Sequence, residues 1–220
     1  MDKAARLLDL ARKRQASRWP GYKPLVEYRH GAYECDFVSP FTKAAGNVDA
    51  AVMILLQDWS SDDELSGELD SGAAELGFTP TSPTNKNLIR LLETHFGLQL
   101  RETYATNIFP FIKRGNLNAT IRTRDLERAA LEFAIPQIDI VSPRLVVCLG
   151  LKTFNALRRG LGMRVEEPID RAIAAPFSRG RARVWCQAHT GTMGQNNRHR
   201  LGIDRVSQDW LAMQSDARLP

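Results

Sequence analysis

Asp58, Asn107 and His189 each lie at or near the end of a separate run of mostly apolar residues. Such runs are typical of strands that are buried on both faces of a sheet. In an open parallel sheet, the carboxyl ends of the strands line the crevice that binds the ligand. A carboxylate, a carboxamide and an imidazole delivered to one crevice would form a site for a planar polar ligand.

The elements that must position these side chains alternate between strands and helices. Apolar runs predict four strands, at residues 49–56, 103–108, 145–149 and 183–188. Helical periodicity and end signals predict helices at 2–15, 84–96, 123–141, 151–159 and 197–214. We therefore expect an α/β fold, a three-layer α/β/α sandwich with a short, mostly parallel four-stranded sheet.

One domain is the default for 220 residues. We expect residues 1–48 to form an N-terminal helix and an irregular packing segment, and residues 49–215 to form the α/β core. The acidic stretch 58–77 is interpreted as a mobile loop with at most a short helix. No run is apolar enough to span a membrane and no secretory signal is evident, so we expect a cytoplasmic protein without a membrane partner. We also expect a monomer.

Charge is unevenly distributed along the chain. The formal net charge is +5, and residues 144–205 hold 12 Lys/Arg against 4 Asp/Glu. A basic C-terminal third suits a polyanionic partner such as DNA, although a solvated basic surface would look the same.

The three cysteines exclude some other kinds of site. Cys35, Cys148 and Cys186 are too few and too far apart for a disulfide framework or a Cys-x-x-Cys metal site. Cys148 and Cys186 fall in strand-like runs and are interpreted as buried thiols. We expect no metal site.

Four segments together resemble the motifs of the uracil-DNA glycosylase superfamily. They are residues 56–60 (Leu-Gln-Asp-Trp-Ser), 106–107 (Thr-Asn), 143–150 (Pro-Arg-Leu-Val-Val-Cys-Leu-Gly) and 189–193 (His-Thr-Gly-Thr-Met). Their order and spacing match over about residues 50–200. Leu56 stands where those enzymes have glycine, and Trp59 and Thr190 stand where they have proline.

The resemblance implies a DNA glycosylase that hydrolyses the N-glycosidic bond of uracil or a related damaged pyrimidine without a cofactor. In that role Asp58 or Gln57 would position water, Asn107 would read the base and His189 would steady the leaving group. The four cysteines that hold an iron–sulfur cluster in some branches are absent. The substituted motif positions leave a non-catalytic nucleic-acid- or nucleobase-binding protein as the alternative.

The resemblance also suggests residues around the reacting group. Phe78 would stack on the base, Trp59 would pack against or close the pocket, and Met193 would fill the gap left by the flipped nucleotide. The residues expected to contact DNA phosphates are Asn197, which we interpret as a helix cap, Arg198 and Arg200.

Each of these side chains also has a structural interpretation. Asn107 could tie down the turn at residues 109–110, Asp58 could be a turn residue, and Phe78 could belong to the core. His189 could be a satisfied histidine at a strand end, and residues 195–200 could be an ordinary surface loop.

Overall fold

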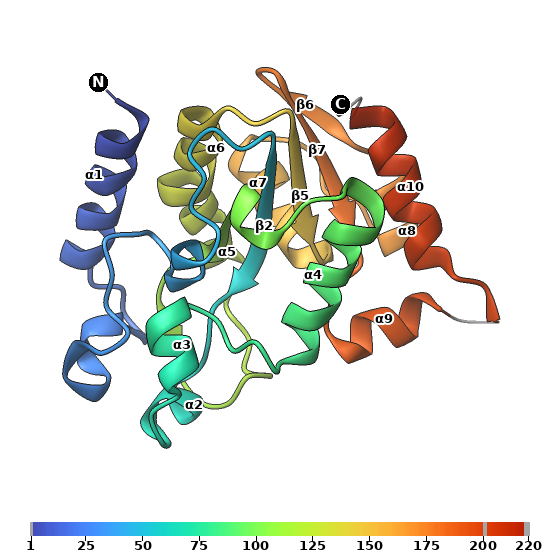
Figure 1. Ribbon diagram of the computed structural model, residues 1–220. Helices are drawn as coiled ribbons and strands as arrows, with labels where there is room; N and C mark the ends of the chain where they lie inside the picture. Colours follow the sequence, from blue (N-terminus) through green and yellow to red (C-terminus); the bar gives the residue numbers. More distant parts are fainter. Residues whose placement is uncertain (1, 200–201, 218–220) are drawn as a thin grey trace.

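A five-stranded sheet forms the centre of the molecule (Figure 1), in a computed structural model that describes residues 2–199 and 202–217. Its strands are β2 (Val52–Asp58), β3 (Tyr104–Phe109), β5 (Leu145–Leu149), β6 (Phe177–Arg179) and β7 (Ala182–Gln187). They lie in the order β3-β2-β5-β7-β6, with every neighbouring pair parallel except β6 and β7. The α/β class and the mostly parallel sheet are confirmed.

The expected number of strands was wrong, because β6 forms a fifth strand at the edge. It has three residues and joins β7 in a hairpin that turns at Gly180, whose φ is +55°. A segment this short carries no recognisable alternation of apolar and polar residues, so the sequence pattern did not predict it.

The longer helices lie close to their predicted positions. They are α1 (Lys3–Ala16), α4 (Pro83–Phe96), α5 (Thr123–Ala129), α6 (Ile135–Val141) and α7 (Leu151–Gly160). The predicted helix 123–141 is continuous, with a π-helical turn at Ala130–Ala134 between α5 and α6. Pro136 lacks the N–H that a regular α-helical bond would need, which explains the wider turn at this point.

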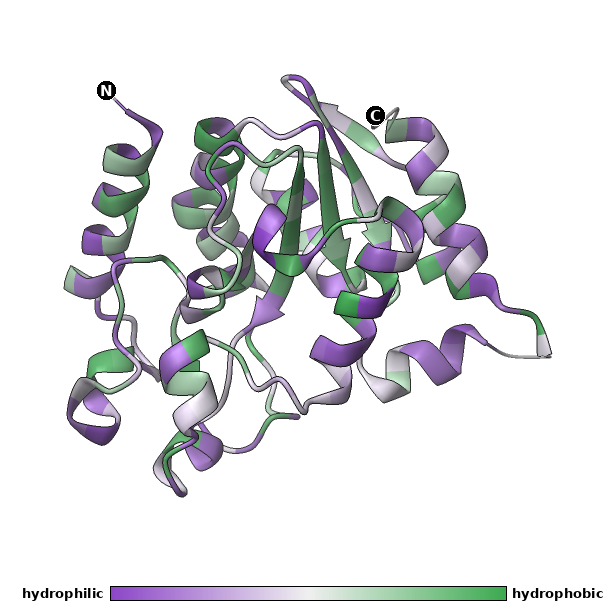
Figure 2. Ribbon diagram, viewed as in Figure 1, coloured by the Kyte–Doolittle hydropathy of each residue, from purple (hydrophilic) through white to green (hydrophobic). Residues whose placement is uncertain are grey.

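Buried side chains connect the sheet to two of the helices that pack against it. Tyr104 donates from its hydroxyl to Gln137 of α6 at 3.0 Å. Gln187 donates to the backbone oxygen of Asp209, in helix α10 (Arg205–Ala217), at 3.1 Å. Strands β2 and β5 are hydrophobic over most of their length (Figure 2), as expected for a covered parallel sheet.

The C-terminal part differs from the prediction of one closing helix. It contains α8 (Ile169–Ile173), α9 (Thr192–Arg198) and α10. Asn197 therefore lies in the last turn of α9, and its predicted role as an N-terminal helix cap was wrong. None of the helices in the described ranges is long and apolar enough to cross a membrane.

The N-terminal segment is irregular, as predicted, but it carries several short elements. These are β1 (Tyr22–Lys23) and three 3-10 turns at Leu25–Glu27, Arg29–Gly31 and Pro40–Lys43. Two short elements lie later in the chain, a 3-10 turn at Leu100–Glu102 and β4 (Ile112–Lys113). β1 and β4 pair in an antiparallel ribbon. Arg14 of α1 is fully buried and donates to the backbone oxygens of Cys35 and Phe37, which holds this segment against α1.

The acidic stretch after β2, expected to be a mobile loop with at most one short helix, contains two short helices. It forms α2 (Asp62–Ser66) and α3 (Ser71–Leu76). Trp59 donates from Nε1 to the backbone oxygen of Gly77 at 2.7 Å, and Lys43 donates to that of Ala74 at 2.7 Å. A Cβ at Gly77 would lie 1.8 Å from the oxygen of Pro40, so only glycine permits this close approach.

Candidate functional site

The register of the sheet brings the three strand-end side chains to one face. Leu56 pairs with Asn107 across β2 and β3, and Asp58 lies two residues beyond Leu56. Because side chains alternate along a strand, Asp58 and Asn107 point to the same side.

His189 follows β7 on the same face of the sheet as Asn107. Leu55 pairs with Cys148, and Cys148 with Cys186, so the next residue of each strand, Gln187 included, shares the face of Asn107. His189 lies two residues beyond Gln187. Three residues that are remote in sequence therefore converge above the carboxyl ends of the strands.

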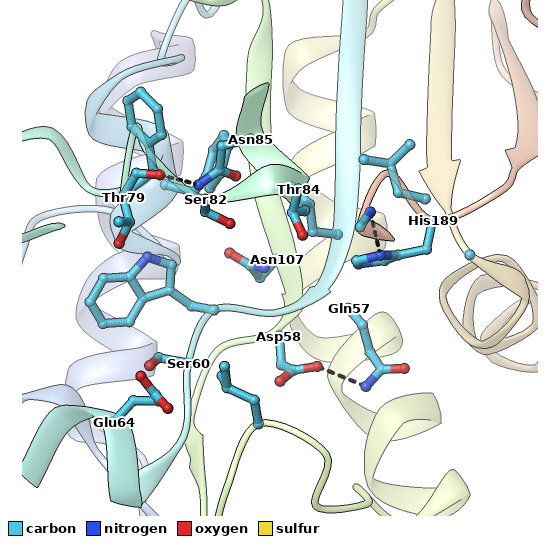
Figure 3. A pocket seen from close by; sticks show the side chains of 18 of the residues that line it. Gln57, Asp58, Ser60, Glu64, Thr79, Ser82, Thr84, Asn85, Asn107 and His189 are labelled. Atoms are coloured by element: carbon cyan, nitrogen blue, oxygen red, sulfur yellow. Dashed lines mark hydrogen bonds between the residues drawn. The ribbon is translucent and has the colours of Figure 1, made fainter. Parts of the chain in front are cut away.

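A cavity of about 1010 Å³ opens at these strand ends. Asp58, Asn107 and His189 all line it, as Figure 3 shows. Five more of the residues singled out from the sequence also line it, namely Gln57, Trp59, Phe78, Met193 and Asn197. The chain continues from β2 to β3 on one side and from β5 to β6 and β7 on the other, which is the strand order found at the ligand crevice of other open α/β sheets.

Asp58 is held by two donors. Gln57 donates from Nε2 to its Oδ1 at 2.7 Å, and Lys113 of β4 lies with its Nζ 2.5 Å from Oδ2. The Lys113 side chain is 5% exposed and that of Asp58 12%, and Lys113 also donates to the backbone oxygen of Leu117 at 2.6 Å. The carboxylate is thus fixed in direction, beside a largely buried ammonium group.

Lys113 was not predicted as a site residue. The sequence singles out Lys113 only by its place directly after the apolar residues 108–112. A lysine there is also consistent with the end of an exposed strand.

Asn107 forms the floor of the cavity and is 1% exposed. Its Oδ1 accepts a hydrogen bond from the Ser39 hydroxyl at 2.5 Å. Its Nδ2 is screened from solvent and has no hydrogen-bond partner among the described residues. A buried donor without an acceptor typically costs about 1–3 kcal/mol, so this amide needs an explanation beyond tying down a turn.

His189 is arranged as a neutral donor. Its Nδ1 accepts the backbone N–H of Gly191 at 3.0 Å, so the proton of the neutral ring resides on Nε2. The ring is open to the cavity, yet desolvation by the surrounding protein lowers the pKa of His189, while the charge of Asp58 acts in the opposite direction. The imidazole is therefore neutral at pH 7.

Two half-buried aromatic residues form walls of the cavity. The ring of Trp59 lies 5.5 Å from that of Tyr33, and Phe78 lies 5.6 Å from Phe41. Trp59 is tied to the α3 segment through Gly77. Both residues line the cavity, and their predicted contacts with a base stay predictions.

The residues expected to contact DNA differ in their surroundings. Met193 is 76% exposed at the rim, and Asn197 is exposed and lines the cavity. Arg198 is 12% exposed and pairs with Asp209 at 2.6 Å and with Asp170. Its guanidinium is thus engaged in holding α9 to its neighbours, so we correct its assignment from a phosphate contact to a structural ion pair.

Arg200 lies outside the described residues, so its predicted contact with phosphate stays a prediction.

The first residues of α4 and α7 also line the cavity, although the sequence did not predict them as site residues. Ser82, Thr84 and Asn85 line the cavity at the start of α4, and Gly150 to Thr153 do so at the start of α7. Helix N-termini carry partial positive charge, so this wall favours electronegative ligand atoms.

No protein-family model and no curated protein matches the chain. Within the described ranges, no group of three or more His, Cys, Asp or Glu side chains could hold a metal ion. The geometry of this cavity is therefore the basis on which a function can be assigned.

Proposed function

We propose that this protein is a DNA glycosylase that hydrolyses the N-glycosidic bond of uracil or a related damaged pyrimidine, as in base excision repair. The observation that carries the proposal is the shared cavity of Asp58, Asn107 and His189. We further propose that helices on both faces of the sheet make a three-layer sandwich, and that the protein acts as a cytoplasmic monomer without a cofactor.

The proposed reaction begins with a nucleotide that leaves the DNA stack, because a base inside a duplex cannot be reached. The base would slide between the aromatic walls and stack on Phe78. Met193 at the exposed rim suits the part of a wedge that fills the gap in the DNA.

Cleavage would break the bond between C1′ and the base nitrogen, with the electron pair leaving on the base. The neutral His189 would donate from Nε2 to a carbonyl oxygen of the base as it becomes an anion. Losing one such preorganised donor typically costs about 10²–10³ in rate. Asp58 would orient the water that attacks C1′ and stabilise the positive charge that develops on the sugar.

A second candidate function is the binding of a nucleobase or nucleic acid without catalysis. The ion pair between Asp58 and Lys113 favours it, because the ammonium offsets the negative charge that an oxocarbenium-like sugar would need. The walls and the Asn107 floor would serve binding equally well.

Strand cleavage tests the two candidates. The purified protein is incubated with single- and double-stranded oligonucleotides that carry one uracil, and abasic sites are then cleaved with alkali. A glycosylase gives strand breaks that disappear in Asn107→Ala and His189→Ala. The control variants Asn196→Ala and His30→Ala change the same residue types at exposed positions outside the cavity lining, and they should retain activity.

The absence of breaks, together with salt-sensitive binding of the same oligonucleotides, would replace the first candidate by the second. The absence of both would overturn the two candidates together.

A further inference from the structure

The amide of Asn107 is directed by Ser39, a residue to which the sequence analysis assigned no role. Ser39 is fully buried and directly precedes the 3-10 turn Pro40–Lys43. Its Oγ lies 2.5 Å from Oδ1 of Asn107, across 68 positions of the chain. The same Oγ accepts the backbone N–H of Phe41 at 3.2 Å.

These two contacts determine which way the amide faces. Since Oγ accepts from Phe41, the hydroxyl proton is left to be donated, and Oδ1 of Asn107 is the acceptor within reach. An amide turned by 180° would leave the buried hydroxyl proton without an acceptor, which is costly. The Nδ2 group is therefore the part of Asn107 that remains free.

The free Nδ2 is a buried donor to which the described residues supply no acceptor. It lies in a side chain that is 1% exposed, on the floor of the cavity, without a partner among the described residues. A ligand that brings an acceptor to this donor supplies a hydrogen bond that the described residues do not give it. A ligand that brings an N–H group meets a second donor and gains nothing.

We propose that Ser39 is a positioning residue that fixes the direction of the Asn107 amide, so that the cavity selects nucleobases with a carbonyl oxygen at the recognised edge over those with an amino group. Uracil and cytosine differ in this way. Uracil offers O4 as an acceptor to Nδ2, and its N3–H can use the second lone pair of Oδ1. Cytosine offers an amino group and an N3 without hydrogen, so both contacts fail.

This inference rests on the proposed role of the cavity as a base-binding site. It predicts base preference, which can be measured without any cleavage. Free uracil and free cytosine are therefore titrated separately into isotopically labelled protein, and the dissociation constants are read from NMR chemical shifts. Cleavage of uracil-containing oligonucleotides is measured in parallel.

The variants separate the direction of the amide from the stability of the turn. Ser39→Ala removes the hydroxyl, and Ser39→Thr keeps it. Thr42→Val is the matched control, because Thr42 is fully buried in the same turn and donates to the backbone oxygen of Ala105 at 2.8 Å without a hydrogen bond to Asn107.

The wild-type protein should bind uracil at least about tenfold more tightly than cytosine, since one lost hydrogen bond in a buried site has about this effect. Ser39→Ala should bring the two affinities to within about threefold, because the amide can then face either way. Ser39→Thr and Thr42→Val should keep the wild-type preference, even where their thermal stability falls.

An unchanged preference in folded Ser39→Ala would overturn the proposal, as would a wild-type protein that binds both bases equally. Preference for uracil without cleavage would refute the glycosylase and leave the Ser39 assignment intact. A wild-type protein that binds neither base would overturn both.

Discussion

Lys113→Met is the substitution whose effect on the free energy of unfolding follows most directly from the structure. Lys113 and Asp58 lie with charged atoms 2.5 Å apart, in side chains that are 5% and 12% exposed. At an effective dielectric constant of about 20, unit charges at this distance attract each other by roughly 6–7 kcal/mol. Desolvation offsets part of that, and removing one partner of a buried pair typically costs about 3–5 kcal/mol.

We therefore expect Lys113→Met to lower the free energy of unfolding by about 3–5 kcal/mol. For a chain of this size, each kcal/mol shifts Tm by roughly 2–4 °C, so the melting temperature should fall by about 6–20 °C. Urea unfolding at pH 7 gives the free energy, and differential scanning fluorimetry gives the shift in Tm.

The antiparallel ribbon supplies a matched control. Lys23 of β1 pairs with Asp62 at 2.9 Å, but its side chain is 38% exposed. Exposed pairs contribute at most about 1 kcal/mol, so Lys23→Met should have a small effect. Equal losses for the two lysines would show that burial does not strengthen the pair at Asp58.

A double-mutant cycle isolates the charge pair from the contact between Lys113 and Leu117. Asp58→Asn, Lys113→Met and the double variant should show a coupling energy of about 2 kcal/mol or more. Additive effects would refute the reasoning, because they would mean that Asp58 and Lys113 do not stabilise each other.

Three further predictions concern His95, Gly194 and Met193. His95 is 5% exposed without a hydrogen-bond partner among the described residues, and burial lowers its pKa. The free energy of unfolding should therefore fall as pH drops below about 6.5, because the unfolded chain binds the proton first. Urea unfolding from pH 7.5 to 5 should show a smaller loss for His95→Phe, and an unchanged pH slope would exclude this residue as a source. A Cβ at Gly194 would lie 2.2 Å from the oxygen of His189, so Gly194→Ala should reduce uracil excision or binding at least about tenfold, whereas Asn196→Ala on the same helix should not. Met193→Ala should change the unfolding free energy by less than about 0.5 kcal/mol because the side chain is 76% exposed, yet it should weaken binding of uracil-containing duplex more than of single strands, and equal weakening would contradict the wedge.

Most of the central sheet was predictable because burial on both faces leaves a strong pattern. Val52–Asp58 and Leu145–Leu149 are mostly apolar, and each lies within three residues of its predicted position. β6 and the β1–β4 ribbon have two or three residues per strand, so their pairing depends on tertiary contacts rather than on local periodicity. The sequence indicated at most one short helix in the acidic stretch and not the pair α2 and α3, because the contacts of Trp59 and Lys43 hold this segment in place.

The residues of the candidate site also fall into a group that the sequence predicts and a group that it does not. Parallel strands align their carboxyl ends, so Asp58, Asn107 and His189 could be placed together from strand positions alone. Ser39 and Lys113 belong to irregular segments with no periodicity, and their contacts with the site appear only when the chain is folded. The acidic network around Arg198 was missed because Asp170 and Asp209 are remote from it in sequence.

The residues that sequence reasoning missed are those that fix the direction of the predicted ones. Lys113 orients Asp58, Ser39 orients Asn107, and the backbone of Gly191 sets the proton of His189 on Nε2. Each contact is made without a ligand and leaves its side chain little freedom to reorganise when one binds. Such preorganisation is what electrostatic stabilisation of a transition state needs, and it also sharpens base recognition. A site of this kind should therefore lose selectivity or rate when only the supporting residue is changed, while the three side chains that face the cavity remain in place.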